Sequence, residues 1–161
     1  MLQRIQTLHF LISMLLFGSL FAGLNFLKFE TKGGQEVSTI DVFGRSSYYI
    51  SNQEEKFVSS QMIPLFLLAL GMIFLLFITL MSYKKLNRQL SLARLTLMIN
   101  ALLVFLFVIW STYLFFDAPS AYNNSVRIGF YLLSCTLPFT YFGYKGVLRD
   151  KMLLDSIDRL R

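Results

Sequence analysis

The side chains that most often carry chemistry in proteins are scarce in this sequence and far apart. His9 is the only histidine and Cys135 the only cysteine. A zinc site needs several nitrogen or sulfur ligands and a b-type haem is usually held by histidines, so we expect no metal and no cofactor. Glu54 and Glu55 are adjacent in a polar stretch, where their carboxylates point apart. Phosphate-binding glycine loops and nucleophile elbows are also missing, so the sequence does not indicate an enzyme.

The polar residues of the apolar run 128–144 are the one group that suggests a buried polar site. Ser134, Thr136 and Tyr141 lie near Pro138, which should kink a helix and free a backbone carbonyl. One interpretation is a polar, water-accessible cavity. The other, which we favour, is that the hydroxyl groups satisfy the backbone of a kinked membrane helix.

Two other features predict helix packing. Four small residues in the run 7–27 form two overlapping small-xxx-small pairs, a spacing that lets a second helix approach closely: Gly18, Ser19, Ala22 and Gly23. The alternative is ordinary membrane composition, in which glycine is common. Asn100 is the one strongly polar residue inside the run 95–116. Such a side chain more often forms a hydrogen bond to a neighbouring helix, worth about 1 kcal/mol, than contacts a substrate.

These residues lie within four apolar runs that contain no Asp, Glu, Lys or Arg. The predicted membrane spans are residues 7–27, 62–83, 95–116 and 128–144. A bilayer core of about 30 Å needs roughly 20 helical residues. The chain is 55% hydrophobic, with a mean hydropathy of +0.58, which favours an integral membrane protein over a soluble one. A signal peptide is the alternative for the first run. Its apolar core is longer than usual and the region of Ala22 lacks a small-x-small cleavage pattern, so we expect an uncleaved helix.

The charges predict how these spans are oriented. The net charge is +6, and ten of the fifteen basic residues fall in the segments 1–6, 84–94 and 145–161. Because basic residues accumulate on the cytoplasmic side of membrane proteins, we expect these segments and both termini there. The predicted partners on that side are anionic lipid headgroups rather than nucleic acid. The residues of this predicted basic face are Arg4, Lys84, Lys85, Arg88, Arg94, Arg159 and Arg161.

The polar segments are then an outer loop 28–60, an inner loop 84–94, a second outer loop 117–127 and an inner tail 145–161. Gly33-Gly34 predicts a β-hairpin in the first outer loop, either as a small cap over the helix ends or as a docking surface. Asn123-Asn124 predicts a turn in the second. The tail has apolar residues at helical spacing, and we expect it to form a short amphipathic helix near the inner loop, with Asp150, Asp155 or Asp158 paired to that loop's basic residues. The predicted fold is an all-α membrane protein, a single domain built as a four-transmembrane-helix bundle with a β-hairpin-like loop.

The two ends of the sequence resemble a known family. The start contains Arg4-Ile5-Gln6-Thr7 and the end contains Asp158-Arg159-Leu160-Arg161. Together with the four-span layout, these motifs resemble the bacterial membrane proteins catalogued as domain of unknown function 4293, found mainly in Bacteroidetes-type bacteria. The acidic-lysine cluster usual in that family's tail is reduced here to Arg149-Asp150-Lys151. The resemblance implies the inner membrane of a Gram-negative cell, and it implies no catalytic activity.

Two functions are consistent with these observations. The charge-free spans favour a structural or accessory subunit of a larger membrane assembly, with other membrane-protein subunits as partners, because pumps and proton relays normally need an ionisable group within the membrane. The alternative is a small transporter or lipid-handling protein that uses the kinked fourth span. An enzyme with its site in the first outer loop is a remote third.

Overall fold

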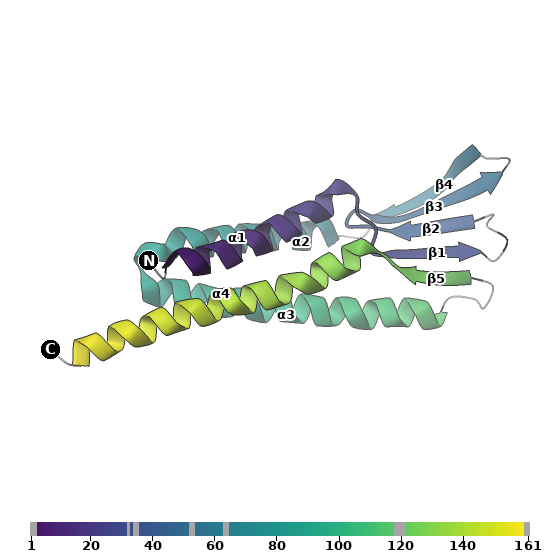
Figure 1. The fold of residues 1–161 in the computed structure, drawn as a ribbon. Coiled ribbons are helices and arrows are strands. Elements are labelled where there is room, and N and C mark those ends of the chain that lie inside the picture. The colour runs from purple at the N-terminus through teal and green to yellow at the C-terminus, as the bar shows by residue number, and fades with distance from the viewer. Residues whose placement is uncertain are drawn as a thin grey trace.

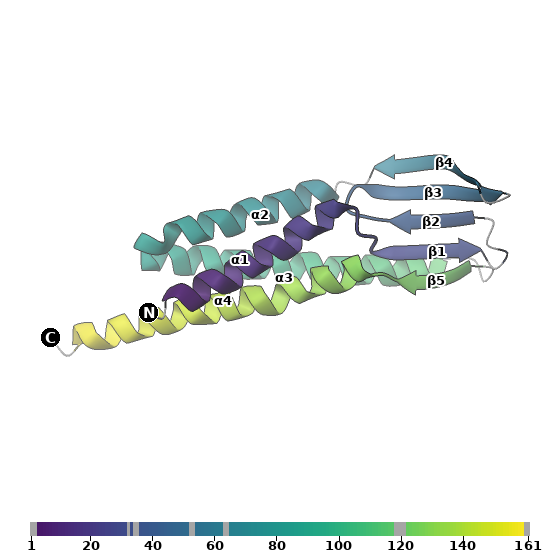
Figure 2. The ribbon, with the colours of Figure 1, turned by 45° about the horizontal axis from the view of Figure 1, so that its top comes forward.

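The computed structural model describes residues 3–31, 33, 36–51, 54–62, 65–117 and 122–159. Helices lying side by side make up one end of the molecule and a β-sheet makes up the other (Figure 1). Helix α1 begins, and helix α4 ends, at the end of the molecule away from the sheet (Figures 1 and 2). The helical elements are α1 (Gln3–Ser19), the 3-10 turn η1 (Leu20–Ala22), α2 (Leu65–Met81), the 3-10 turn η2 (Ser82–Lys84), α3 (Leu86–Asp117) and α4 (Ile128–Arg159).

Within the described residues, three helical segments are long and apolar enough to cross a membrane. They are Ile5–Ala22, Leu65–Lys84 and Leu86–Asp117. They agree with the first three predicted spans and indicate a membrane protein. Helix α4 is not among them, because hydroxyl groups and glycines interrupt its first half and charged residues fill its second.

The prediction of an all-α four-transmembrane-helix bundle is wrong. The described residues form a five-stranded antiparallel sheet with the strand order β4-β3-β2-β1-β5. The expected hairpin is only part of that sheet, because the polar segment between α1 and α2 contributes four strands rather than two. The strands are β1 (Leu27–Thr31), β2 (Glu36–Ile40), β3 (Gly44–Ser51), β4 (Glu54–Met62) and β5 (Tyr122–Val126).

Alternation of apolar and polar residues explains the pairing of β1 with β2. Leu27 lies opposite Ile40 and Phe29 opposite Ser38, so these buried side chains share one face of the sheet. A tight turn then leads into β3. In this turn the Asp41 carboxylate accepts hydrogen bonds from the backbone amides of Phe43 and Gly44, at 2.8 Å and 2.9 Å.

The fifth strand comes from the segment in which a turn was predicted. Asn123 and Asn124 are not a turn: they pair with Glu30 and Phe29 of β1, respectively. Asparagine is uncommon in strands, and here the ladder with β1 overrides that local preference. The backbone amide of Arg127 also donates to the carbonyl of Phe26, at 2.9 Å, which ties the start of α4 to the start of β1.

Two helices continue through segments that were predicted to be separate. Helix α3 begins at Leu86, so most of the predicted inner loop is helical. Helix α4 continues through Pro138 and through the predicted tail to Arg159, so the short amphipathic C-terminal helix is not a separate element. Pro138 has no backbone N–H to donate, so the helix lacks one hydrogen bond there, and it nevertheless continues on both sides of the proline.

The hydrophobic core is continuous from the helices into the sheet. The rings of Phe26, just before β1, and Phe107, on α3, meet edge to face with their centroids 4.9 Å apart. Further along, Phe29 on β1 and Phe115 near the end of α3 lie 5.8 Å apart. Helix α3 therefore supports the β1–β5 side of the sheet (Figure 2). Large apolar side chains on the outer surfaces of α2 and α3 are exposed, as expected for helices in contact with lipid.

Candidate functional site

The predicted polar site and the predicted packing residue Asn100 meet between α3 and α4. The Asn100 side-chain amide donates to the hydroxyl of Thr140 at 3.0 Å, and its carbonyl accepts from the hydroxyl of Thr136 at 3.1 Å. All three side chains are fully buried. The site therefore also includes Thr140, at the end of the predicted polar stretch 134–140 and one helical turn from Thr136.

The other two predicted members of the polar site lie apart from this group. The Ser134 hydroxyl donates to the backbone carbonyl of Phe130 at 2.9 Å, within its own helix. Tyr141 is 44% exposed on the surface of α4. The contacts around Asn100 are thus a closed hydrogen-bonded set that joins two helices, rather than the lining of a polar cavity.

A second buried contact joins α2 to α3. The hydroxyls of Thr79 and Thr96 are 3.2 Å apart, and Thr96 lies one helical turn before Asn100. A third contact joins α1 to α4, where the Gln6 side chain donates to the carboxylate of Asp150. Polar side chains thus join three of the helix pairs in contact: α3–α4, α2–α3 and α1–α4. Such bonds give membrane helices their register because apolar packing alone is not specific.

Within the described part of the chain, the predicted small-residue face on α1 makes no close contact with another helix at Gly18 or Gly23. Gly18, Ala22 and Gly23 are exposed, and a Cβ atom placed on Gly18 or Gly23 would meet nothing within 4 Å. Gly23 has another role: it ends η1 in the left-handed conformation, with a φ of 75°. The Ser19 hydroxyl donates to the carbonyl of Leu16, within the helix.

The glycines that allow close helix contact are on α4 instead. A Cβ atom on Gly143 would lie 2.7 Å from the ring of Phe10, and one on Gly146 would lie 2.5 Å from the Gln6 side chain. These two α4 residues are one turn apart and face α1. Their spacing was a readable signal, but sequence alone does not distinguish these glycines from those in α1.

An apolar cavity of about 290 Å³ lies among α1, α2 and α3 near the sheet. Its lining is entirely apolar and includes Phe26 and Val42 from the connections into and between strands. From the helices it includes Ala69, Leu102 and Trp110. This cavity therefore suits a hydrocarbon chain, and it is distinct from the polar contacts of α4.

A basic groove, defined here by Phe74, Phe77, Met81, Lys84, Lys85 and Arg88, lies at the turn between α2 and α3. Its volume is about 490 Å³. All six side chains are exposed. It contains three of the residues predicted for the basic face, and Arg94 is exposed further along α3. The side chains of Arg4 and Arg159, and all of Arg161, lie outside the described part of the chain.

The described residues show no ion pairs between the predicted inner tail, 145–161, and the predicted inner loop, 84–94. Asp150 instead contacts Gln6 of α1, and Asp155 is exposed. Asp158 has no described side chain. Helix α4 packs against α1 and α3 and then extends past the other helices (Figures 1 and 2), which carries the end of the tail away from the α2–α3 turn.

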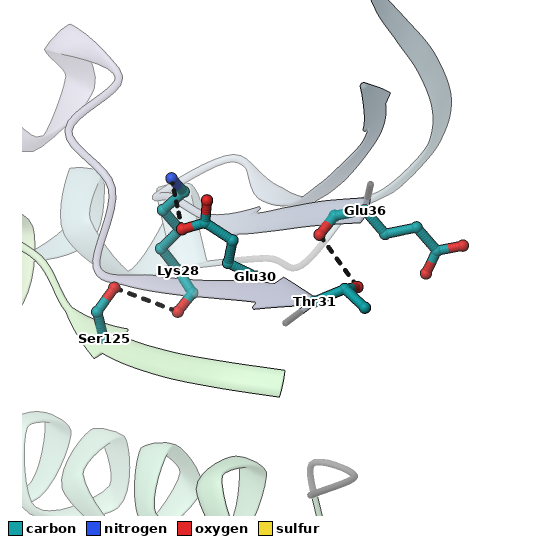
Figure 3. Close-up of polar contacts among 5 residues, drawn as sticks. All are labelled: Lys28, Glu30, Thr31, Glu36 and Ser125. Atoms are coloured by element: carbon teal, nitrogen blue, oxygen red, sulfur yellow. Dashed lines mark hydrogen bonds and ion pairs between the residues drawn. The ribbon is translucent and has the colours of Figure 1, made fainter. Parts of the chain in front are cut away.

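The sheet has its own polar contacts, shown in Figure 3. Lys28 and Glu30 form an ion pair of 3.1 Å on one side of β1, and the Thr31 hydroxyl donates to the backbone carbonyl of Glu36 at 3.3 Å. The Ser125 hydroxyl of β5 donates to the backbone carbonyl of Lys28 at 3.4 Å. Among the described residues, no three His, Cys, Asp or Glu side chains are grouped so that they could hold a metal ion. The hydrogen bonds of Thr31 and Ser125 join neighbouring strands and help to hold them in register.

Comparison with known families identifies one that matches this chain. The family described as Domain of unknown function (DUF4293) matches residues 2–160, nearly the whole chain, and this confirms the resemblance at the two ends of the sequence. No curated protein matches the sequence. The family description names no activity, so function has to be argued from the sheet, the cavity and the basic groove.

Proposed function

The chain belongs to the family described as Domain of unknown function (DUF4293), and we propose that it is a non-catalytic accessory subunit of a larger assembly in a bacterial inner membrane. In this proposal the helices anchor the protein and the sheet presents a surface to a partner outside the membrane. The polar contacts between helices then serve to hold the anchor in one arrangement.

The observation that carries the proposal is the way the sheet is fixed to the helices. Strand β1 is paired on both sides, with β2 and with β5. Helix α1 leads into β1 and β5 leads into α4, so two helices are joined to neighbouring strands of the sheet. The contact between Phe29 and Phe115 adds support from α3. A sheet joined at several points keeps a fixed orientation relative to the membrane, which favours binding because little freedom is lost when a partner docks.

The described sheet has two edge strands, β4 and β5, and the β4 edge is the surface that we assign to the partner. Strand β4 pairs with β3 on one side, and the described chain provides no strand on its other side. An edge strand presents unpaired backbone N–H and C=O groups, which an extended segment of another protein can extend by one strand. Polar residues on β4, including the exposed Ser59 and Ser60, suit an edge that faces water before the partner binds.

The orientation in this proposal follows the basic residues. Lys84, Lys85 and Arg88 lie at the end of the helices opposite the sheet, so the positive-inside tendency supports a cytoplasmic position for that end. Both termini are then cytoplasmic and the sheet is in the periplasm.

Site-specific photocrosslinking tests the proposal in living cells. A photoreactive residue at Ser60, on β4, should crosslink to a specific partner protein, and mild-detergent purification should recover that partner in stoichiometric amount. The matched control is the same residue at Met98, an exposed position on α3 that should contact lipid. Recovery of only monomers or homo-oligomers in several detergents, with no crosslink at Ser60, would rule out the subunit role.

The apolar cavity favours lipid handling as a second candidate function. A hydrocarbon chain that entered the cavity would come close to Trp110, the only tryptophan of the chain, which lines it. Lipids with brominated acyl chains should then quench the tryptophan fluorescence strongly. Ala69→Phe should fill the cavity and reduce the quenching, whereas Gly71→Phe, at an exposed position with no atoms nearby, should leave it unchanged. Equal quenching in all three proteins would contradict this function.

A further inference from the structure

The basic groove combines two surfaces that are usually found apart. Phe74, Phe77 and Met81 follow each other at helical spacing along α2 and form an exposed apolar wall. Lys84 and Lys85 continue the same line into the α2–α3 turn. A wall that suits hydrocarbon thus ends at a cluster that suits negative charge.

The positive charge of this cluster is not neutralised by acidic groups of the described chain. The segment 84–94 contains no Asp or Glu. Among the described residues the one recorded ion pair is Lys28–Glu30, within the sheet. Asp150, the tail carboxylate nearest in sequence to the span of α4, accepts a hydrogen bond from Gln6. The cations of the groove are therefore available to an anion from outside the chain.

The start of α3 adds to the attraction for an anion. The helix begins at Leu86, and the amide of Gln89 donates to the carbonyl of Lys85, just before the helix, at 2.9 Å. The amides of the preceding first turn have no partner inside the helix, and the helix dipole makes this end positive. The unpaired amides and the positive end of the helix dipole thus lie beside Lys84 and Lys85.

We propose that the basic groove binds one anionic phospholipid, with its phosphate at Lys84, Lys85 and Arg88 and an acyl chain along Phe74, Phe77 and Met81. Charge complementarity selects the phosphate, and the adjoining apolar wall selects a lipid over a soluble phosphate compound. This site is separate from the sheet and goes beyond the proposed subunit function, since it requires only that the helices lie in a membrane.

Lipid retention during purification tests this site. The full chain should be purified in a neutral detergent, supplied with phosphatidylglycerol or phosphatidylcholine, washed, and examined for bound lipid by native mass spectrometry. We expect phosphatidylglycerol to be retained and phosphatidylcholine to be lost. Each basic residue near an anionic membrane surface raises affinity about fivefold, so K84Q/K85Q/R88Q should weaken phosphatidylglycerol binding by roughly a hundredfold.

A second triple variant controls for net charge. Arg94, Lys145 and Arg149 are exposed basic residues outside the groove, so R94Q/K145Q/R149Q removes the same charge and should retain the lipid. Equal loss of lipid in both triple variants would overturn the proposal, because it would show a general charge effect. Retention by K84Q/K85Q/R88Q would also overturn it.

The apolar wall distinguishes a lipid from a soluble anion. F74A/F77A keeps every charge and should lower the retention of phosphatidylglycerol, whereas millimolar inorganic phosphate should not displace the lipid from the wild-type protein. Displacement by phosphate together with unchanged binding in F74A/F77A would overturn the lipid in favour of a free phosphate site. Partner recovery through the sheet is a separate measurement, so either proposal can fail while the other stands.

Discussion

The side chain of Asn100 on α3 donates a hydrogen bond to Thr140 on α4 at 3.0 Å, and neither side chain is exposed. The hydroxyl of Thr140 donates in turn to the backbone carbonyl of Leu137 at 2.8 Å. The threonine thus accepts from one helix and donates within its own. This arrangement satisfies a buried amide in the middle of a long apolar helix and sets the register between α3 and α4.

Replacing the amide should weaken this pair of helices moderately. Asn100→Leu keeps a similar volume and removes the bonds to Thr136 and Thr140, whose hydroxyls can still donate to carbonyls of their own helix. We therefore expect the free energy of unfolding in detergent to fall by about 1 kcal/mol. Thr112→Val, at an exposed position of α3, should change it little. An equally stable Asn100→Leu protein would show that the bond does not hold the helices.

Close contact between α1 and α4 should make Gly143 sensitive to substitution. In Gly143→Ala the new methyl group would lie 2.7 Å from the buried ring of Phe10, so the ring or the helix must move. Overpacking of this kind costs about 1–3 kcal/mol, measured as a loss in the free energy of unfolding. Gly18→Ala places its methyl group in open space and should be neutral or slightly stabilising. Equal effects of the two substitutions would contradict the helix contact seen here.

The aromatic contact between β1 and α3 should control how firmly the sheet is held. Phe115→Ala removes the ring that faces Phe29. The loss of the aromatic pair should lower the free energy of unfolding by about 0.5–1.5 kcal/mol, in addition to the effect of burying less apolar area. Hydrogen exchange of the backbone amides in β1 and β5 should then become faster, whereas exchange in α2 should not change. The neighbouring Phe116 is 86% exposed, so Phe116→Ala should leave the sheet protected. Faster exchange in both variants would point to an effect on α3 as a whole.

The proposed orientation can be tested with single cysteines. In a Cys135→Ser background, Ser60→Cys on β4 should react with a membrane-impermeant maleimide in spheroplasts, and Asn87→Cys at the start of α3 should react only after lysis. Both positions are exposed, so a difference in labelling would reflect the side of the membrane. Labelling of Asn87→Cys alone in spheroplasts would reverse the orientation.

The elements that could be predicted from the sequence are those with a local signal. The first three apolar runs correspond to helices that can cross a membrane, because length and composition are sufficient for that inference. The pairing of β1 with β2 lies on either side of Gly33, as the turn residues indicated. Three of the four basic residues in the segment 84–94, Lys84, Lys85 and Arg88, also lie together in one groove.

Other features depend on contacts that have no local signal. Three strands and two long helices separate β5 from β1 in the sequence. The pair Asn123-Asn124 therefore indicates a turn locally, and only the pairing with β1 makes it a strand. Gly18 and Gly143 look equivalent in sequence, and only the position of Phe10 gives Gly143 its role. Most of the segment 84–94 is helical because leucine, arginine and glutamine favour the helix, and positive charge by itself does not terminate a helix.

The position of β1 between β2 and β5 has a consequence for the order in which the sheet can form. Strands β1 to β4 are synthesised in succession and can pair at once as a meander, but the other side of β1 pairs with Tyr122–Val126. That segment leaves the ribosome after α2 and α3, so the sheet stays incomplete until two more helices have been made. The last strand is therefore made only after α3, and a failure at that step leaves β1 as an exposed edge in place of β5.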